Sequence, residues 1–415
     1  MTSRNVFLQI HGMKGKLFLL FAMLCGFFIT TEYAITKPIS NSIFLAHYSV
    51  KLYPYAWLLT VPLNLLTVVL YNKLLPRFGC FRMLLSTALL TMGINVFCGL
   101  YVKQFPSLSF LFYIWKDIYV LLMFQQLWSV IHTRTEMKRA KYLYGIIFGV
   151  SGIGAVFGSM APGFFAVKFG SEHLLILTVP LYFLLIGAYY LMLRQTEIKE
   201  VAPTQTQKTE GGVQLIRSSS SLQFILLIVI LMQLSTTIME YQFNTYLQER
   251  YPIQDFRTQF YGQLCGVMNI CKLCLQFFAT FLLVKFLGLR KSHFIVPGIL
   301  FGNAFLILMQ PTFGVITYGF SVIKTFDYSV FNIIKEMLYV PLKNDEKFKA
   351  KAIIDVFAYR SAKALASIFV IGVQFLFPSK LPYAYSWGPF TLFVLWIFAV
   401  IFYFRKSKEQ KLLEA

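Results

Sequence analysis

Charged side chains inside long apolar runs are the residues of this sequence whose chemistry most needs an explanation. Each costs roughly 2.5–3.5 kcal/mol at the centre of a membrane helix unless it faces a partner or water. Because both signs occur, we predict a cavity that neutralises itself when empty and rearranges around a charged solute. The residues are Glu32, Lys116, Asp117, Glu240, Lys272, Lys324, Asp327, Lys335, Glu336, Asp355, Arg360 and Lys363, with Lys37 at the edge of its run.

Spacing along the chain indicates which of these groups meet. Asp327 lies three residues after Lys324, and Lys335 lies eleven residues after Lys324. An unbroken helix would therefore place all three on roughly one face. Tyr33 and Lys37 are four residues apart and share a face in the same way. The residues predicted to pair helices or to gate the cavity are Glu32, Asp117, Lys324, Asp355 and Arg360.

A second interpretation stays open for three of the charges. Lys335, Glu336 and Lys363 lie close to the predicted ends of their helices, where a long side chain can extend to the cytoplasmic interface. Groups nearer the middle of a span, such as Glu32 and Glu240, instead favour a functional role or a pair within a helix bundle.

The elements that must hold these charges are membrane-spanning helices. Hydrophobic residues make up 57% of the chain and charged residues 13%, and the mean hydropathy is +0.65, far from the values of soluble domains. Twelve runs are long enough to cross a bilayer, which takes about 20 residues of helix. They lie near 17–36, 55–75, 83–102, 109–132, 143–168, 174–193, 222–247, 259–287, 293–310, 313–338, 352–377 and 386–404.

The distribution of Lys and Arg predicts the orientation in the membrane. These residues are concentrated in the N-terminal segment, in alternate loops and in the C-terminal segment, and cytoplasmic segments are enriched in them. Both termini are therefore predicted to be cytoplasmic. The first helix follows no signal or transit peptide, so we predict a multi-pass protein of a bacterial inner membrane. The net charge of +21 indicates contact with anionic lipid, and nucleic acid is not needed as a partner.

One long polar stretch divides the chain. Residues 194–221 include EVAPTQTQKTEGG and SSSS, a composition typical of a linker. We predict an all-α membrane protein with an N-terminal six-helix bundle at 1–193, a cytoplasmic linker at 194–221 and a C-terminal six-helix bundle at 222–415. This is the major facilitator-like 6+6 arrangement, in which two pseudo-symmetric bundles close around a central cavity.

The sequence does not predict a site for bond-breaking chemistry. It holds no Ser/His/Asp set, phosphate-binding loop or metal-ligand spacing, so we predict no enzyme, no catalytic residue, no metal and no cofactor. Cys271 and Cys274 form a CxxC motif, which is a weak metal or redox signal without a second ligand pair. Gly154 and Gly158 follow no strand, and their spacing of four indicates a helix that packs closely against a neighbour.

A motif near the end of the chain is more specific. KEMLYVPLKNDEKFKAKAIIDV (335–356) resembles a signature of the nucleotide transporter family, the ATP/ADP translocases of obligate intracellular bacteria and plastids. FQQLWSVI (124–131), IMEYQFNTYLQERYP (238–252) and YAITKPISNSIFL (33–45) are similar to other segments of that family. The resemblance implies a membrane carrier for nucleotides.

The resemblance also assigns site residues. The family's substrate-site lysine falls on Lys335, and a glutamate of its seventh helix falls on Glu240. A glutamate of its fourth helix is replaced by Gln126, and a lysine of its first helix aligns with position 40 or 41, with Lys37 one turn earlier as a replacement charge. The predicted substrate-binding residues are Lys37, Lys116, Gln126, Glu240, Asp327 and Lys335.

Taken together, these patterns predict a secondary transporter that moves a nucleotide or nucleotide-like anion by alternating access, by exchange or by proton coupling. The anion is expected to bridge Lys37 or Lys116 and Lys335, which Glu240 and Asp327 neutralise when the site is empty. The alternatives are a facilitator for a different organic anion or cofactor and, in a different class, a membrane-embedded enzyme or lipid-handling protein. The expected partners are the anion and membrane lipid, and the pattern is compatible with a monomer.

Overall fold

The protein is helical throughout the part that the structure describes. The structure is a computed structural model, and it describes residues 13–134, 137–195, 212–282, 288–339, 353–377 and 381–413. Every regular element in these ranges is a helix, which confirms the predicted all-α class. Eight helices within the ranges are long and apolar enough to cross a membrane. The count of twelve crossings and the 6+6 symmetry remain predictions.

The helices follow the predicted apolar runs along the chain. The first half contains α1 (Met13–His47), α2 (Tyr53–Tyr101), α3 (Ser107–Arg134), α4 (Met137–Phe169) and α5 (Thr178–Arg194), with the short turns η1 (Val50–Leu52) and η2 (His173–Leu177). The second half contains α6 (Gly212–Ser218), α7 (Ser220–Arg250), α8 (Gln254–Leu282), α9 (Gly288–Met309), α10 (Phe313–Phe326), η4 (Asp327–Phe331), α11 (Asn332–Tyr339), η6 (Ile353–Ala358), α12 (Tyr359–Leu376) and α13 (Leu381–Leu413).

A glycine bends α2. The predicted spans 55–75 and 83–102 both lie in this helix, on either side of Gly79. Gly79 has a φ of 73° and a ψ of 166°, a backbone conformation that residues with a side chain rarely adopt. The glycine therefore supplies the turn between two arms, each of which corresponds to one predicted span.

The chain forms two compact units. Unit 1 comprises the described residues within Met1–Ser49, Pro62–Gln205 and Tyr251–Ile270. Unit 2 comprises Val50–Val61, Thr206–Arg250 and Cys271–Ala415. Each unit therefore includes a segment from the other half of the sequence: the start of α2 belongs to unit 2, and the start of α8 belongs to unit 1.

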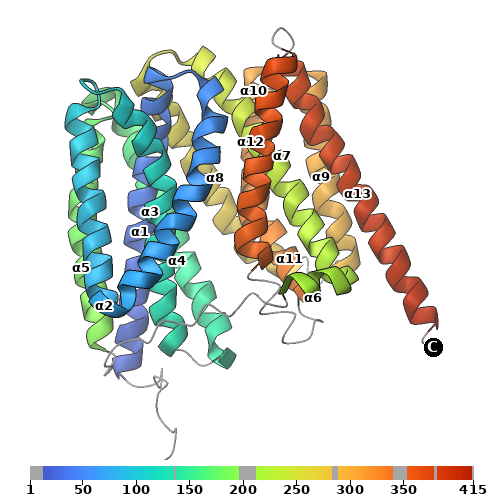
Figure 1. Ribbon diagram of the computed structural model, residues 1–415, viewed down its shortest axis with the longest axis horizontal. Coiled ribbons are helices and arrows are strands. Elements are labelled where there is room, and N and C mark those ends of the chain that lie inside the picture. The colour runs from blue at the N-terminus through green and yellow to red at the C-terminus, as the bar shows by residue number, and fades with distance from the viewer. Residues whose placement is uncertain are drawn as a thin grey trace, which may run out of the picture. The chain divides into compact units, whose positions relative to one another are not determined.

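Unit 1 is built around α1, which packs against α3, α4 and α5 (Figure 1). Thr30 Oγ1 donates a hydrogen bond to the Ser151 carbonyl of α4 at 2.6 Å, and Thr31 Oγ1 donates to the Gly154 carbonyl at 3.1 Å. Gly154 and Gly158 allow this approach, because a Cβ at either position would collide with backbone oxygens of α1. The close packing predicted from the spacing of these two glycines is confirmed.

Replacing Gly158 by alanine is expected to lower the stability of unit 1. The new Cβ would collide with the Thr31 carbonyl, and such overpacking typically costs about 1–3 kcal/mol. Gly187→Ala is the matched control, because a Cβ at Gly187 of α5 meets no atom within 4 Å. The measurement is the midpoint of thermal unfolding in detergent. Equal midpoints for the two variants would contradict the close contact of α1 and α4.

Unit 2 is built around α7, which packs against α10, α12 and α13. The Phe243 ring of α7 stacks on Phe320 of α10, with ring centres 4.3 Å apart and planes 3° apart. The Phe224 ring of α7 stacks on Tyr403 of α13 at 4.2 Å. Aromatic pairs of this kind stabilise a helix contact beyond the apolar area they bury. They hold α7 and its charged groups in a fixed position within unit 2.

Candidate functional site

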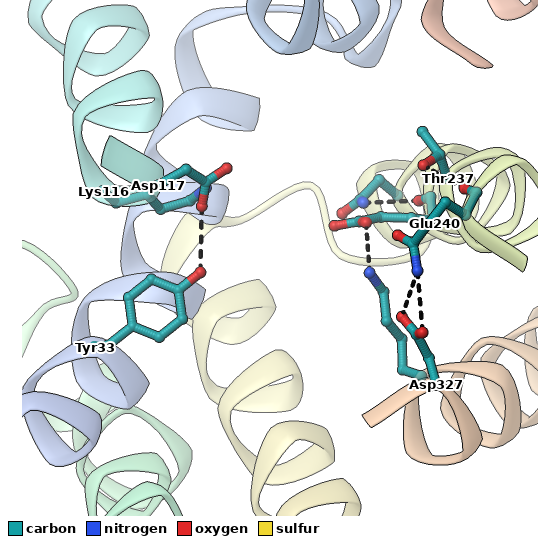
Figure 2. A network of polar contacts seen from close by, with 9 residues as sticks. Tyr33, Lys116, Asp117, Thr237, Glu240 and Asp327 are labelled. Carbon is teal, nitrogen blue, oxygen red and sulfur yellow. Dashed lines mark hydrogen bonds and ion pairs between the residues drawn. The ribbon is translucent and has the colours of Figure 1, made fainter. Parts of the chain in front are cut away.

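A first cluster of charged groups lies in unit 1, on α1 and α3 (Figure 2). Lys116 is 4% exposed, and its Nζ lies 3.1 Å from Asp117 Oδ1. The Tyr33 hydroxyl of α1 donates to the same oxygen at 3.2 Å. Lys116 Nζ also lies 3.8 Å from the centre of the Tyr113 ring, a cation–π contact. A buried ammonium group held in this way can exchange its carboxylate partner for an anionic ligand.

A second cluster lies in unit 2, on α7, α10 and η4 (Figure 2). Lys324 Nζ donates to Glu240 Oε2 at 2.8 Å, a short charge-assisted hydrogen bond. Gln233 Nε2 of α7 donates to both carboxylate oxygens of Asp327, at 3.0 and 3.1 Å. Asp327 is 4% exposed. Glu240 therefore pairs with Lys324, a lysine for which the sequence predicted helix pairing or gating, while Asp327 is held by a neutral amide.

Three lysines act on the Asp327 carboxylate. Lys324, Lys335 and Lys272 all attract it electrostatically. Lys335 of α11 is 3% exposed, and its Nζ lies 5.2 Å from the centre of the Tyr359 ring. Lys272 of α8 is half-buried, with its Nζ 4.8 Å from the centre of a tyrosine ring in η4. Against these three lysines stand the carboxylates of Asp327 and Glu240, and the excess of positive charge favours an anionic ligand.

A π-helical turn, η4, separates Lys324 from Lys335. A π turn adds a residue to the helical repeat, so the residues after it are rotated relative to an unbroken α-helix. The shared face inferred from spacing assumed no such turn, yet the structure keeps Lys335 within electrostatic range of Asp327. A second π turn, η6, contains Asp355, whose side chain lies outside the described part of the structure. Such turns are frequent at functional sites.

The remaining predicted residues lie on three helices. Lys37 is half-buried on α1, one turn after Tyr33. Gln126 of α3 is 1% exposed and donates to Thr87 Oγ1 of α2 at 3.2 Å. Arg360 is half-buried at the start of α12. In the same helix, Lys363 is half-buried with its Nζ 5.3 Å from the centre of an indole ring in α2.

Glu32 lies at the centre of a buried network in unit 1. It is 2% exposed, and its Oε1 accepts hydrogen bonds from Thr36 Oγ1 at 2.7 Å and from Asn95 Nδ2 at 3.0 Å. Tyr119 Oη lies 2.8 Å from Oε2 and 3.0 Å from Oε1. Asn95 Nδ2 also donates to Tyr182 Oη at 3.3 Å. The network joins α1, α2, α3 and α5 through neutral donors.

Sequence reasoning missed uncharged members of the second cluster and of the Glu32 network. Gln233, Asn95 and Tyr119 are polar residues within apolar runs, and they hold the carboxylates of Asp327 and Glu32. A search for buried hydrogen-bonding side chains in the predicted spans would have found them together with many others. Only the tertiary contacts select these three, because their partners lie on other helices.

Comparison with known proteins places these observations in a family. The family model described as TLC ATP/ADP transporter matches residues 90–406. The ADP,ATP carrier protein 1 of Rickettsia typhi (strain ATCC VR-144 / Wilmington) is 25% identical over 345 residues, which cover 72% of this chain and 68% of that protein. The protein of the same name from Rickettsia prowazekii (strain Madrid E) is 24% identical over 345 residues, with the same coverage of both chains.

Solved structures of transporters share the fold. A bacterial homolog of the human lysosomal transporter Spinster, in an inward-facing and unoccupied conformation, gives a TM-score of 0.60 at 12% identity and covers 95% of this chain and 97% of its own. The nucleoside transporter NupG gives a TM-score of 0.57 at 11% identity and covers 96% and 100%. The chain therefore shares the fold of these two transporters. The match of the family model over most of the chain identifies a multi-span carrier and not an enzyme. The chain belongs to the TLC ATP/ADP transporter family.

Proposed function

We propose that this chain carries a nucleotide, or a nucleotide-like anion that bears phosphate, across a bacterial inner membrane by alternating access. The observation that carries the proposal is the burial of Lys116 and Lys335, which are 4% and 3% exposed within an apolar chain. A buried ammonium group is retained where it has a partner or a ligand of opposite charge. The relatives are ADP,ATP carrier proteins, which supports a nucleotide as that ligand.

Exchange of ionic partners is the binding chemistry that we propose. Asp117 neutralises Lys116 in unit 1, and Glu240 neutralises Lys324 in unit 2. A phosphate oxygen that replaces either carboxylate keeps the lysine charge-paired, so binding exchanges one charge-assisted hydrogen bond for another. Lys335 adds a further ammonium group beside Asp327. The proposed substrate-binding residues remain Lys37, Lys116, Gln126, Glu240, Asp327 and Lys335.

Alternating access would let the same residues face one side of the membrane and then the other. We propose that the two compact units are the parts that move, with both termini on the cytoplasmic side. A carrier that returns only when loaded exchanges one nucleotide for another. A carrier that also returns empty can use a proton gradient to import nucleotide against the nucleotide's own gradient. By resemblance, Gln126 replaces a glutamate of the family, which would remove one negative charge from the site.

Uptake into proteoliposomes tests the proposal. Purified protein should take up labelled ATP or ADP, and unlabelled nucleotides should compete more strongly than nucleosides, NAD or sugar phosphates. Vesicles preloaded with ADP distinguish exchange from net import, because exchange requires an internal substrate. Vesicles without protein are the control. If no nucleotide enters under either condition, or if a phosphate-free solute competes best, nucleotide transport by this chain is refuted.

A further inference from the structure

Glu32 is a buried acid that the proposed nucleotide site does not use. We propose that Glu32 is the proton-binding site of this carrier, an assignment that rests on the proposed transport function and adds the coupling ion. Binding of a proton forms an O–H bond on one carboxylate oxygen and neutralises the side chain. Its release reverses that step, and no other bond is made or broken.

The surroundings of Glu32 contain hydrogen-bond donors and no cation within the described residues of the network. Tyrosine phenols and amides are neutral at physiological pH, so a charged Glu32 is stabilised by dipoles alone. Among the cations of the adjoining segments, Lys116 is bound to Asp117 and Lys103 to Glu172, while the half-buried Lys37 lies on α1 five residues after Glu32. The groups that face Glu32 are Thr36 of α1, Asn95 of α2, Tyr119 of α3 and Tyr182 of α5.

Protonation of Glu32 would change the contact of α1 with α3. Tyr119 Oη lies within hydrogen-bond distance of both carboxylate oxygens, and a protonated oxygen must donate where it now accepts. The next residue of α1, Tyr33, donates to Asp117 of α3, which holds Lys116. Proton binding at Glu32 is thereby linked to the lysine that we assign to phosphate binding.

Two hydroxyl groups on α1 extend the polar region beside Glu32 along the helix. Glu32, Thr36 and Ser40 follow one another at intervals of four, so they lie on one face of the helix. Thr36 Oγ1 already bonds to the carboxylate at 2.7 Å. Ser40 is fully buried, and its Oγ has no hydrogen-bond partner among the described residues. A buried hydroxyl group with an unused donor extends the polar row beyond Thr36, toward the C-terminal end of α1.

Infrared spectroscopy of the purified full chain tests proton binding without transport. The wild-type protein should show a carboxylic acid C=O band that disappears as the pH rises, and Glu32→Gln should remove this band. Glu249→Gln, at an exposed carboxylate near the end of α7, is the matched control and should leave the band unchanged. Thr36→Val should move the midpoint of the titration, and it serves as a second variant if Glu32→Gln fails to fold. A band that is identical in the wild type and both site variants would overturn the proposal.

Transport separates this proposal from the proposed function. A gradient of about one pH unit supports about tenfold accumulation when one proton enters with each nucleotide and no membrane potential opposes it. The wild type should reach that accumulation, whereas Glu32→Gln should lose it and keep nucleotide exchange. If Glu32→Gln accumulates nucleotide as the wild type does, Glu32 is not the coupling site although transport stands. If the wild type transports no nucleotide, the proposed function fails, and the infrared titration still decides whether Glu32 binds a proton.

Discussion

Lys335→Ala is expected to abolish nucleotide uptake while leaving the amount of folded protein in the membrane unchanged. Lys335 is 3% exposed on α11 and acts on Asp327 together with two other lysines. Loss of a hydrogen bond to a charged group costs about 1.5–3 kcal/mol, which corresponds to a loss of affinity of roughly 10-fold to 150-fold for each phosphate contact. The measurement is the initial rate of labelled nucleotide uptake into vesicles that contain equal amounts of protein.

Two controls separate the role of Lys335 from the total positive charge of the protein. Lys103→Ala removes a lysine whose side chain is 71% exposed, and uptake should stay close to that of the wild type. Lys335→Arg keeps the charge but changes the shape of the donor, and it should retain part of the uptake. Undiminished uptake by Lys335→Ala would remove this residue from the substrate site.

Glu240→Gln is expected to destabilise unit 2 and to reduce uptake. The substitution removes the closest counter-charge of Lys324, which is 8% exposed, and breaking a buried ion pair in this way costs about 3 kcal/mol. The double variant Glu240→Gln/Lys324→Gln removes both charges. It should recover most of the lost stability, but not uptake, because the proposed substrate site still lacks the Glu240 carboxylate. The measurement is the thermal unfolding midpoint together with uptake.

The comparison with an exposed carboxylate makes this result specific. Glu249→Gln changes a residue of the same type on the same helix, and its unfolding midpoint should match that of the wild type. A double variant no more stable than Glu240→Gln would show that the loss comes from the glutamate itself, through its other contacts, and that the ion pair with Lys324 contributes little.

The helices were largely predictable because the apolar runs that cross a membrane must satisfy their backbone hydrogen bonds internally. The bend at Gly79 was not predictable, because a glycine in a basic loop is equally compatible with a bend in one helix and with a break between two helices. The charges at the two clusters were also predictable, since Lys116, Glu240 and Asp327 interrupt apolar sequence. Their cost inside a membrane marks such residues in any sequence.

The partners of those charges were not predictable. Glu240 pairs with Lys324 across 84 positions, and Glu32 receives hydrogen bonds from three other side chains, on α1, α2 and α3. Only the packing of the helices decides such contacts, and helical periodicity describes one helix at a time. The π turn after Lys324 adds a rotation that no spacing rule includes, because π turns are rare and have no strong sequence signal.

The division of α2 and α8 among the two compact units has a consequence for synthesis of the protein. Unit 1 includes Tyr251–Ile270, so it stays incomplete until the ribosome has translated the whole of α7 and the first part of α8. The start of α2 belongs to unit 2, so its packing partners are translated only later. A polypeptide released before Ile270 would therefore lack part of unit 1, and the apolar surface that such an incomplete chain exposes favours aggregation.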